Sequence, residues 1–133
     1  MSRALIYAVE RRDYLFYVRA SIGADDRQPK VVRLLIDTGA RRTVLPKYLL
    51  REFGCNVDQP DQTIRVTAAG GVLQVPIVVV PWFNCIGCRI DRFSVLALDL
   101  PPSAQVDGLL GMDFLTRVGA VVDVEKGEVR LKE

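Results

Sequence analysis

The stretch Leu34–Ala40, with the sequence LLIDTGA, decides the fold that we expect for this chain. Three large apolar residues run directly into an acidic residue, so Asp37 is expected where a buried strand ends. Thr38 adds a hydroxyl for local hydrogen bonds, and Gly39 lets other backbone approach closely or adopts an unusual dihedral angle. Asp-Thr-Gly is also favourable turn chemistry, so a simple turn at Asp37 is the alternative interpretation.

A second stretch, Asp107–Leu115 with the sequence DGLLGMDFL, follows about seventy positions later. It places two large apolar residues, Leu109 and Leu110, and a glycine directly before a short expected helix. Taken as a sequence feature alone, the two leucines are also interpretable as ordinary core residues.

A hairpin is expected between these two stretches. Residues 62–68 alternate in polarity, Gly70 and Gly71 favour a small, flexible turn, and residues 72–80 form the expected return strand. The alternative is an ordinary hairpin turn without a function.

In this order, the three stretches resemble the retropepsin-like aspartic proteases, and the chain looks closer to the cellular and bacterial members. In that family an apolar strand ends in Asp-Thr/Ser-Gly-Ala, a hairpin forms a flap, and a hydrophobic-hydrophobic-Gly motif precedes a C-terminal helix. The resemblance covers about residues 14–131 of one domain spanning 1–133. It implies a mainly β, closed-barrel-like acid protease fold with two short helices and one catalytic lobe per chain.

The resemblance implies an aspartic endopeptidase in which Asp37 is catalytic, supported by Thr38 and Gly39. No second Asp-Thr-Gly or Asp-Ser-Gly is present. The two carboxylates of the family's catalytic pair would therefore come from a homodimer, and they would activate water against a peptide or protein substrate without metal or cofactor. The residues implied to bind substrate are Ala40, Arg41, Ala69, Gly70, Gly71, Leu109 and Leu110. The alternative is a catalytically weak or inactive dimerisation or peptide-binding module of the same fold.

Two arginines depart from the retroviral pattern. Arg41 and Arg42 stand where retroviral relatives have acids that border the substrate channel, and Met112 stands where they often have an arginine. Two arrangements remain open: Arg41 pairs with Asp113 in reverse polarity, or both arginines are solvated.

The composition excludes several kinds of site. The chain contains no histidine, which rules out Ser-His-Asp and Cys-His catalysis and the common histidine-based zinc sites within it. Lys plus Arg number 18 and Asp plus Glu 16, for a net charge of +2, which favours neither nucleic acid nor a membrane surface as a partner. The apolar run over residues 75–83 is far short of a membrane-spanning helix.

The three cysteines, an odd and low number, favour a reducing compartment. We see no signal peptide and expect a cytoplasmic protein. Cys85 and Cys88 have a CxxC spacing, for which zinc binding, a redox pair and a hairpin turn at Gly87 are alternatives. The hairpin turn is favoured, because a closed zinc site needs four ligands.

The rest of the sequence predicts a chain of short strands with two small helices. The helices are expected over 46–53 and 113–118, and the strands over 14–22, 31–36, 62–68, 72–80, 89–98, 121–124 and 128–131.

Overall fold

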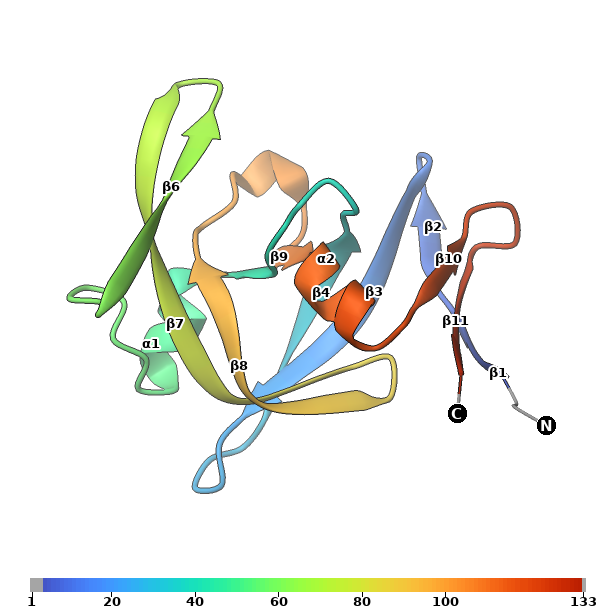
Figure 1. Ribbon diagram of the computed structural model, residues 1–133, viewed down its shortest axis with the longest axis horizontal. Coiled ribbons are helices and arrows are strands. Elements are labelled where there is room, and N and C mark those ends of the chain that lie inside the picture. Colours follow the sequence, from blue (N-terminus) through green and yellow to red (C-terminus); the bar gives the residue numbers. More distant parts are fainter. Residues whose placement is uncertain (1–3, 133) are drawn as a thin grey trace.

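The computed structural model describes residues 4–132. Strands dominate it, and the helical segments are short (Figure 1). The elements in chain order are β1 (Ala4–Ala8), β2 (Glu10–Arg12), β3 (Leu15–Gly23), β4 (Lys30–Ile36), β5 (Val44–Leu45), α1 (Lys47–Glu52), β6 (Gln62–Ala68), β7 (Gly71–Cys85), β8 (Cys88–Ala97), the 3-10 helix η1 (Pro102–Ala104), β9 (Gly108–Leu110), α2 (Met112–Arg117), β10 (Val121–Asp123) and β11 (Glu128–Lys132).

Six strands close into a barrel. Neighbouring strands pair in the order β3-β4-β9-β5-β8-β7, and an additional antiparallel pairing of β7 with β3 closes the ring. Two pairings are parallel, β4 with β9 and β5 with β8. The expected fold class, a mainly β closed barrel with two short α-helices, is therefore confirmed.

Three phenylalanines form the centre of the barrel core. Phe83 from β7, Phe93 from β8 and Phe114 from α2 have ring centroids 5.1 to 6.1 Å apart. Phe83 and Phe114 are fully buried, so α2 is held against the barrel by its apolar face. The long strands β7 and β8 turn at Ile86 and Gly87, with Cys85 paired opposite Cys88, as the hairpin interpretation of the CxxC spacing predicts.

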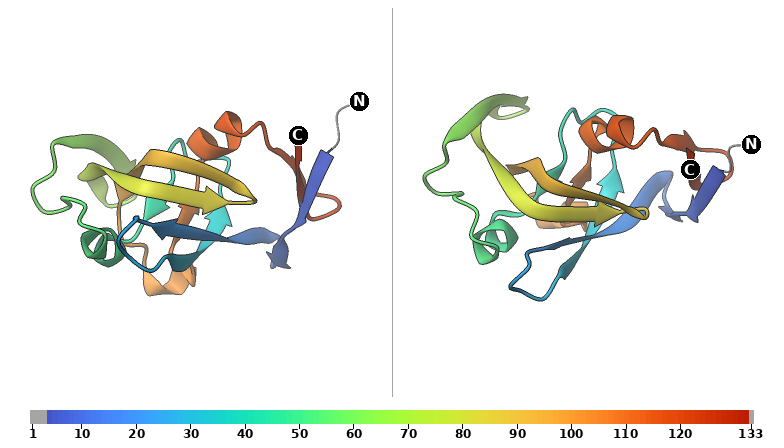
Figure 2. Two further views of the ribbon diagram at one scale, coloured as in Figure 1. Left: turned by 90° about the horizontal axis from the view of Figure 1, so that it is seen from below. Right: turned by 60° about the horizontal axis from the view of Figure 1, so that its bottom comes forward.

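The two ends of the chain form a second sheet. β11 lies between β1 and β10 in the order β1-β11-β10, with Leu5 opposite Leu131 and Val122 opposite Val129. The C-terminal hairpin of β10 and β11 was expected from the sequence. The pairing of β1 with the other edge of β11 was not expected. This terminal sheet and the β6–β7 hairpin lie at opposite ends of the molecule (Figure 1, Figure 2).

The β6–β7 hairpin extends beyond the barrel (Figure 1). Its strands pair from Gln62–Ile77 up to Ala68–Gly71, which leaves a two-residue turn at its tip. The tip and the loop that follows β4 both lie toward the top of the view in Figure 1. Within residues 4–132, no helix has the length and apolar character required to cross a membrane.

Candidate active site

Asp37 lies where two parallel strands end side by side. β4 pairs with β9 so that Ile36 is opposite Leu110, and the next backbone N–H, that of Asp37, donates to the carbonyl of Leu110 at 3.0 Å. The strand-end position expected for Asp37 is therefore present in the structure. We call residues 37–43, which follow β4, the Asp37 loop.

Hydrogen bonds within the loop orient the Asp37 carboxylate. The N–H of Gly39 donates to Oδ1 of Asp37 at 2.9 Å, and the N–H of Ala40 donates to the Asp37 carbonyl at 3.1 Å. Asp37 is half-buried, whereas Thr38 and Gly39 are exposed. Among residues 4–132, no basic side chain forms an ion pair with Asp37. The carboxylate is thus held by its own loop and reaches the surface.

Asp113 anchors the far end of the loop. Its carboxylate accepts hydrogen bonds from Thr43 N at 3.0 Å, from Thr43 Oγ1 at 2.8 Å and from Phe114 N at 2.8 Å. Thr43 is fully buried, and its Oγ1 accepts a further bond from Gly111 N at 3.2 Å. Sequence reasoning did not identify this anchor, although an acid in the first turn of a helix is the pattern that marks such an N-terminal partner.

Of the two arrangements left open for the arginines, the pairing of Arg41 with Asp113 is not present in the structure. The Asp113 carboxylate is occupied by Thr43 and Phe114, and the link to Arg41 is a backbone one, in which Asp113 N donates to the Arg41 carbonyl at 3.1 Å. Arg41 is exposed and Arg42 half-buried, and neither forms an ion pair within residues 4–132. The second arrangement, with both guanidinium groups solvated, fits these observations.

Close backbone packing explains why the two positions 108 and 111 beside the Asp37 loop are glycine. A Cβ on Gly108 would lie 1.9 Å from the carbonyl oxygen of Val44, and a Cβ on Gly111 would lie 2.6 Å from the carbonyl carbon of Arg42. Either contact would displace backbone, so the Asp-Gly-Leu-Leu-Gly spacing lets β9 pass directly beneath the Asp37 loop.

The two leucines of this motif have different environments. Leu110 is fully buried in the barrel core, so its side chain supports the Asp37 loop from below and presents no surface to a substrate. Leu109 is half-buried and packs against the smaller cluster of Val44, Val75 and Leu96 at the base of the β6–β7 hairpin. Of the two leucines, only Leu109 therefore keeps side-chain surface that is accessible beside the Asp37 loop.

The tip of the β6–β7 hairpin stands free in the single chain. Ala69, Gly70 and Gly71 are exposed, and a Cβ on Gly70 or Gly71 would meet nothing within 4 Å. Val72 and Leu73 beside the tip are also exposed, at 53% and 47%. The hairpin tip thus offers an exposed surface that is partly apolar.

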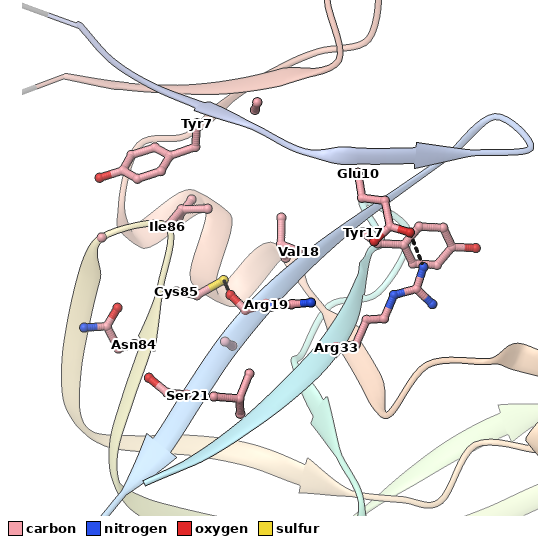
Figure 3. A pocket seen from close by; sticks show the side chains of 14 residues that line it. Tyr7, Glu10, Tyr17, Val18, Arg19, Ser21, Arg33, Asn84, Cys85 and Ile86 are labelled. Atoms are coloured by element: carbon pink, nitrogen blue, oxygen red, sulfur yellow. Dashed lines mark hydrogen bonds and ion pairs between the residues drawn. The ribbon is translucent and has the colours of Figure 1, made fainter.

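A groove of about 690 Å³ lies apart from Asp37, between β1, β3, β4 and the β7–β8 turn (Figure 3). Glu10, the one carboxylate among its described lining residues, is paired with Arg33 at 2.9 Å. The Arg33 guanidinium also stacks on Tyr17, 4.0 Å from the ring centroid. No lining residue belongs to the Asp37 loop or the β6–β7 hairpin, so this groove offers no second acid to Asp37.

The cysteines are free thiols in this structure. Burial raises the pKa of Cys85 to about 12, and its Sγ donates to the Arg19 carbonyl at 3.6 Å. Burial also raises the pKa of Cys88. A thiol with a raised pKa carries little thiolate at neutral pH and is a poor nucleophile and metal ligand. Among the described residues, no group of three or more histidine, cysteine or acidic side chains is placed to hold a metal ion.

Comparisons with known proteins converge on one family. The family model described as "Aspartyl protease" matches residues 18–114, which include the Asp37 loop, the β6–β7 hairpin and β9. The crystal structure of a retropepsin-like aspartic protease from Rickettsia conorii is similar with a TM-score of 0.71 and 23% identity, covering 99% of this chain and 92% of that chain. The solution structure of Simian Foamy Virus (mac) protease is similar with a TM-score of 0.52 and 20% identity, covering 75% of this chain and 91% of that chain. No curated protein sequence matches significantly.

Proposed function

Because this chain belongs to the aspartyl protease family and has a retropepsin-like fold, we propose that it is an endopeptidase with Asp37 as its catalytic residue. The observation that carries the proposal is the Asp37 carboxylate itself. It reaches the surface at the ends of β4 and β9, is oriented by Gly39, and has no described ion-pair partner. We take residues 1–133 as a single domain, with its core in about 14–131.

The catalytic unit that we propose is a homodimer. One chain supplies one Asp-Thr-Gly and therefore one carboxylate. A twofold axis beside the Asp37 loop brings Asp37 and its mate together, and two carboxylates that close share one proton. Aspartic proteases are the general example of two carboxylates that share one proton because both cannot ionise at close range.

Peptide hydrolysis then needs only water and the pair. The ionised carboxylate takes a proton from a bound water while the protonated carboxyl polarises the scissile carbonyl, so no covalent intermediate forms. An extended peptide lies between the Asp37 loop and the β6–β7 hairpin and pairs with backbone. Thr38 and Gly39 support the pair. Ala40, Arg41 and Leu109 line the channel, together with Ala69, Gly70 and Gly71 from the hairpin, which closes over the substrate and excludes water.

A peptide-library digest with Asp37→Asn tests this function. We expect the wild type to cleave internal peptide bonds with a bell-shaped pH profile on the acidic side, and Asp37→Asn to lose cleavage while keeping its far-UV circular dichroism. As a control, Asp26→Asn removes an exposed carboxylate in the β3–β4 turn, away from the Asp37 loop, and should cleave as the wild type does. Cleavage by Asp37→Asn at the wild-type rate would place the chemistry elsewhere. A wild type that binds peptides without cleaving them would identify a binding module instead.

A further inference from the structure

The groove of about 690 Å³ that lies apart from Asp37 covers a gap in the strand pairing of β3. β4 pairs along one edge of β3. On the other edge β2 pairs with β3 up to Tyr17 and β7 pairs with it from Ala20 onward. Val18 and Arg19 therefore have no strand partner on that edge within the described part of the chain. We call this groove the β3 groove; its lining residues lie within positions 7–10, 17–21, 31–33 and 84–87.

The gap leaves a backbone acceptor at the floor of the β3 groove. Cys85 Sγ donates to the Arg19 carbonyl at 3.6 Å, and a thiol is a weak donor. A carbonyl oxygen has two lone pairs, so this one keeps the capacity to accept a stronger hydrogen bond from a ligand N–H. The backbone of β3 thus offers a binding group that a peptide can use.

Two arginines stand directly opposite each other beside this gap. Arg19 on β3 pairs in register with Arg33 on β4. Both side chains point outward, because side chains alternate along a strand and the neighbouring Val18, Val32 and Leu34 are buried in the core. Like charges directly opposite each other destabilise a sheet. The chain therefore keeps two arginines here against a cost that its own strand pairing imposes.

The two arginines differ in how the chain holds them. Arg33 donates to Glu10 at 2.9 Å and to the Gln105 carbonyl at 2.8 Å, and its guanidinium lies over the Tyr17 ring (Figure 3). Arg19 is exposed and forms no ion pair within residues 4–132. Since Glu10 neutralises Arg33, Arg19 gives the β3 groove one uncompensated positive charge.

The size and the walls of the β3 groove fit a peptide better than a small anion. Its floor crosses from β4 over β3 to β7, about 10 Å at the usual strand spacing, which is the length of about three extended residues. Val31, at 67% exposure, provides an apolar wall at one side. Tyr7 from β1 closes the other side over the β7–β8 turn, where a Cβ on Gly87 would lie 2.1 Å from the Tyr7 hydroxyl oxygen.

We propose that the β3 groove binds an extended acidic segment of another protein, with a carboxylate on Arg19 and apolar side chains against Tyr7 and Val31. The choice of occupant rests on charge complementarity, because a carboxylate beside Arg19 converts the repulsion between the two arginines into attraction. No residue of the Asp37 loop lines the β3 groove, so this binding does not depend on the proposed catalysis.

Fluorescence anisotropy with two labelled peptides tests the β3 groove. The acidic probe is a short fluorescein-labelled peptide of alternating glutamate and valine, and the neutral probe has glutamine in place of glutamate. We expect the acidic probe to bind at least about fivefold more tightly than the neutral one, and this preference to disappear near 1 M salt, where the screening length is about 3 Å.

Reversal of the free charge should abolish this preference. Arg19→Glu should raise the dissociation constant of the acidic probe at least about tenfold, because it replaces a charge-assisted contact by repulsion. Arg117→Glu is the matched control: Arg117 is exposed on α2, lies outside the β3 groove and has no described ion pair, so this variant should bind as the wild type does.

Amide chemical shifts locate the bound probe. They are recorded on Asp37→Asn, which removes any cleavage and should bind the acidic probe as tightly as the wild type. We expect shift changes in residues 17–21 and 84–87. Changes confined to the Asp37 loop and the β6–β7 hairpin would place the probe in the substrate channel and overturn the proposal. Binding in the β3 groove by a chain that cleaves no peptide would support this site and contradict the proposed function.

The thermal stability of Arg19→Glu separates binding from folding. The substitution places opposite charges across β3 and β4, so the variant should melt no lower than the wild type. Equal affinity for both probes, or wild-type affinity in Arg19→Glu, would overturn the proposal. Sedimentation velocity tests a second copy as the occupant, and a wild-type dimer that dissociates in Arg19→Glu would overturn the acidic segment in favour of that copy.

Discussion

Asp113 determines the shape of the Asp37 loop from a different part of the chain. Its carboxylate accepts hydrogen bonds from the backbone N–H and the hydroxyl of Thr43 and from the backbone N–H of Phe114 in α2. Hydrogen bonds to an ionised acceptor are stronger than those between neutral groups, and Thr43 is fully buried. Removal of the carboxylate would leave buried donors without a partner.

We therefore expect Asp113→Ala to lower the free energy of unfolding by about 2–3 kcal/mol, measured by urea denaturation. Peptide cleavage should fall as well, because the Asp37 loop loses its anchor. Thr43→Ser keeps the hydroxyl and should cost less than Thr43→Val, which removes it. Equal losses in the two Thr43 variants would show that packing, and not the hydrogen bond to Asp113, holds the loop.

Arg41 and Arg42 are expected to select acidic substrates. Their guanidinium groups have no described ion-pair partner, so they are available to Asp or Glu a few positions from the scissile bond. We expect such acidic residues to raise kcat/KM by about two- to fivefold, and this preference to disappear near 1 M salt, where the screening length is only about 3 Å.

The variants Arg41→Ala and Arg42→Ala, profiled against a peptide library, measure this preference. Each should weaken selection for acids with little change in stability. Because the Arg41 side chain forms no described hydrogen bond or ion pair with the Asp113 carboxylate, the stability effects of Arg41→Ala and Asp113→Ala are expected to add. An unchanged subsite preference in both arginine variants would refute the channel role.

At the scale of elements, long alternating segments were predictable and short ones were not. The strand 62–68, the hairpin 121–124/128–131 and both helices appear close to their expected bounds, whereas the strand expected over 72–80 continues to Cys85. β5 and β9 span two and three residues, too short for a period of two to be visible, and they exist because Gly108 allows β9 to approach Val44. β1 depends on its pairing with β11 at the other end of the chain, which no local pattern encodes.

The residues of the candidate site likewise divide into those that could be predicted from the sequence and those that could not. Asp37 and the hairpin glycines were identifiable because their residue types are chemically distinctive at that spacing. Burial of Leu110 and the role of Asp113 depend on contacts between distant segments, so the sequence left the burial of Leu110 ambiguous and did not identify Thr43 as the partner of Asp113.

The terminal sheet should weaken in acid. Lys126 N donates to Asp123 at 2.9 Å and Arg130 pairs with its other oxygen at 2.6 Å, and these bonds hold the pKa of Asp123 below its usual value. A lowered folded-state pKa contributes stability that is complete above the unfolded value of about 3.9 and is lost as pH falls through the folded value.

Thermal melting against pH checks this expectation. Asp123→Asn should melt below the wild type between about pH 5 and 7, and the difference should vanish near pH 2. Glu125→Gln, an exposed acid in the same turn with no described ion pair, serves as the control and should follow the wild type. A constant difference between Asp123→Asn and the wild type at all pH values would exclude titration of Asp123 as its cause.

At the scale of the whole molecule, activity should depend on protein concentration. One chain carries one Asp-Thr-Gly, so a monomer lacks the second carboxylate of the proposed pair. Specific activity in a peptide-cleavage assay should therefore rise through the same concentration range in which sedimentation detects dimer. Full activity in a demonstrated monomer would contradict the dimeric mechanism.

The anchoring of the Asp37 loop by distant segments also affects how the protein folds. Thr43 and Asp113 are 70 positions apart, and Gly111 and Thr43 are 68 apart. Closing loops of that length costs chain entropy before any contact compensates for it, so such contacts form late, after the local hairpins. A nascent chain has no assembled Asp37 loop until α2 has been synthesised and docked. The proposed endopeptidase is thus inactive while it is still unfolded, at the stage when neighbouring copies would be most vulnerable to cleavage.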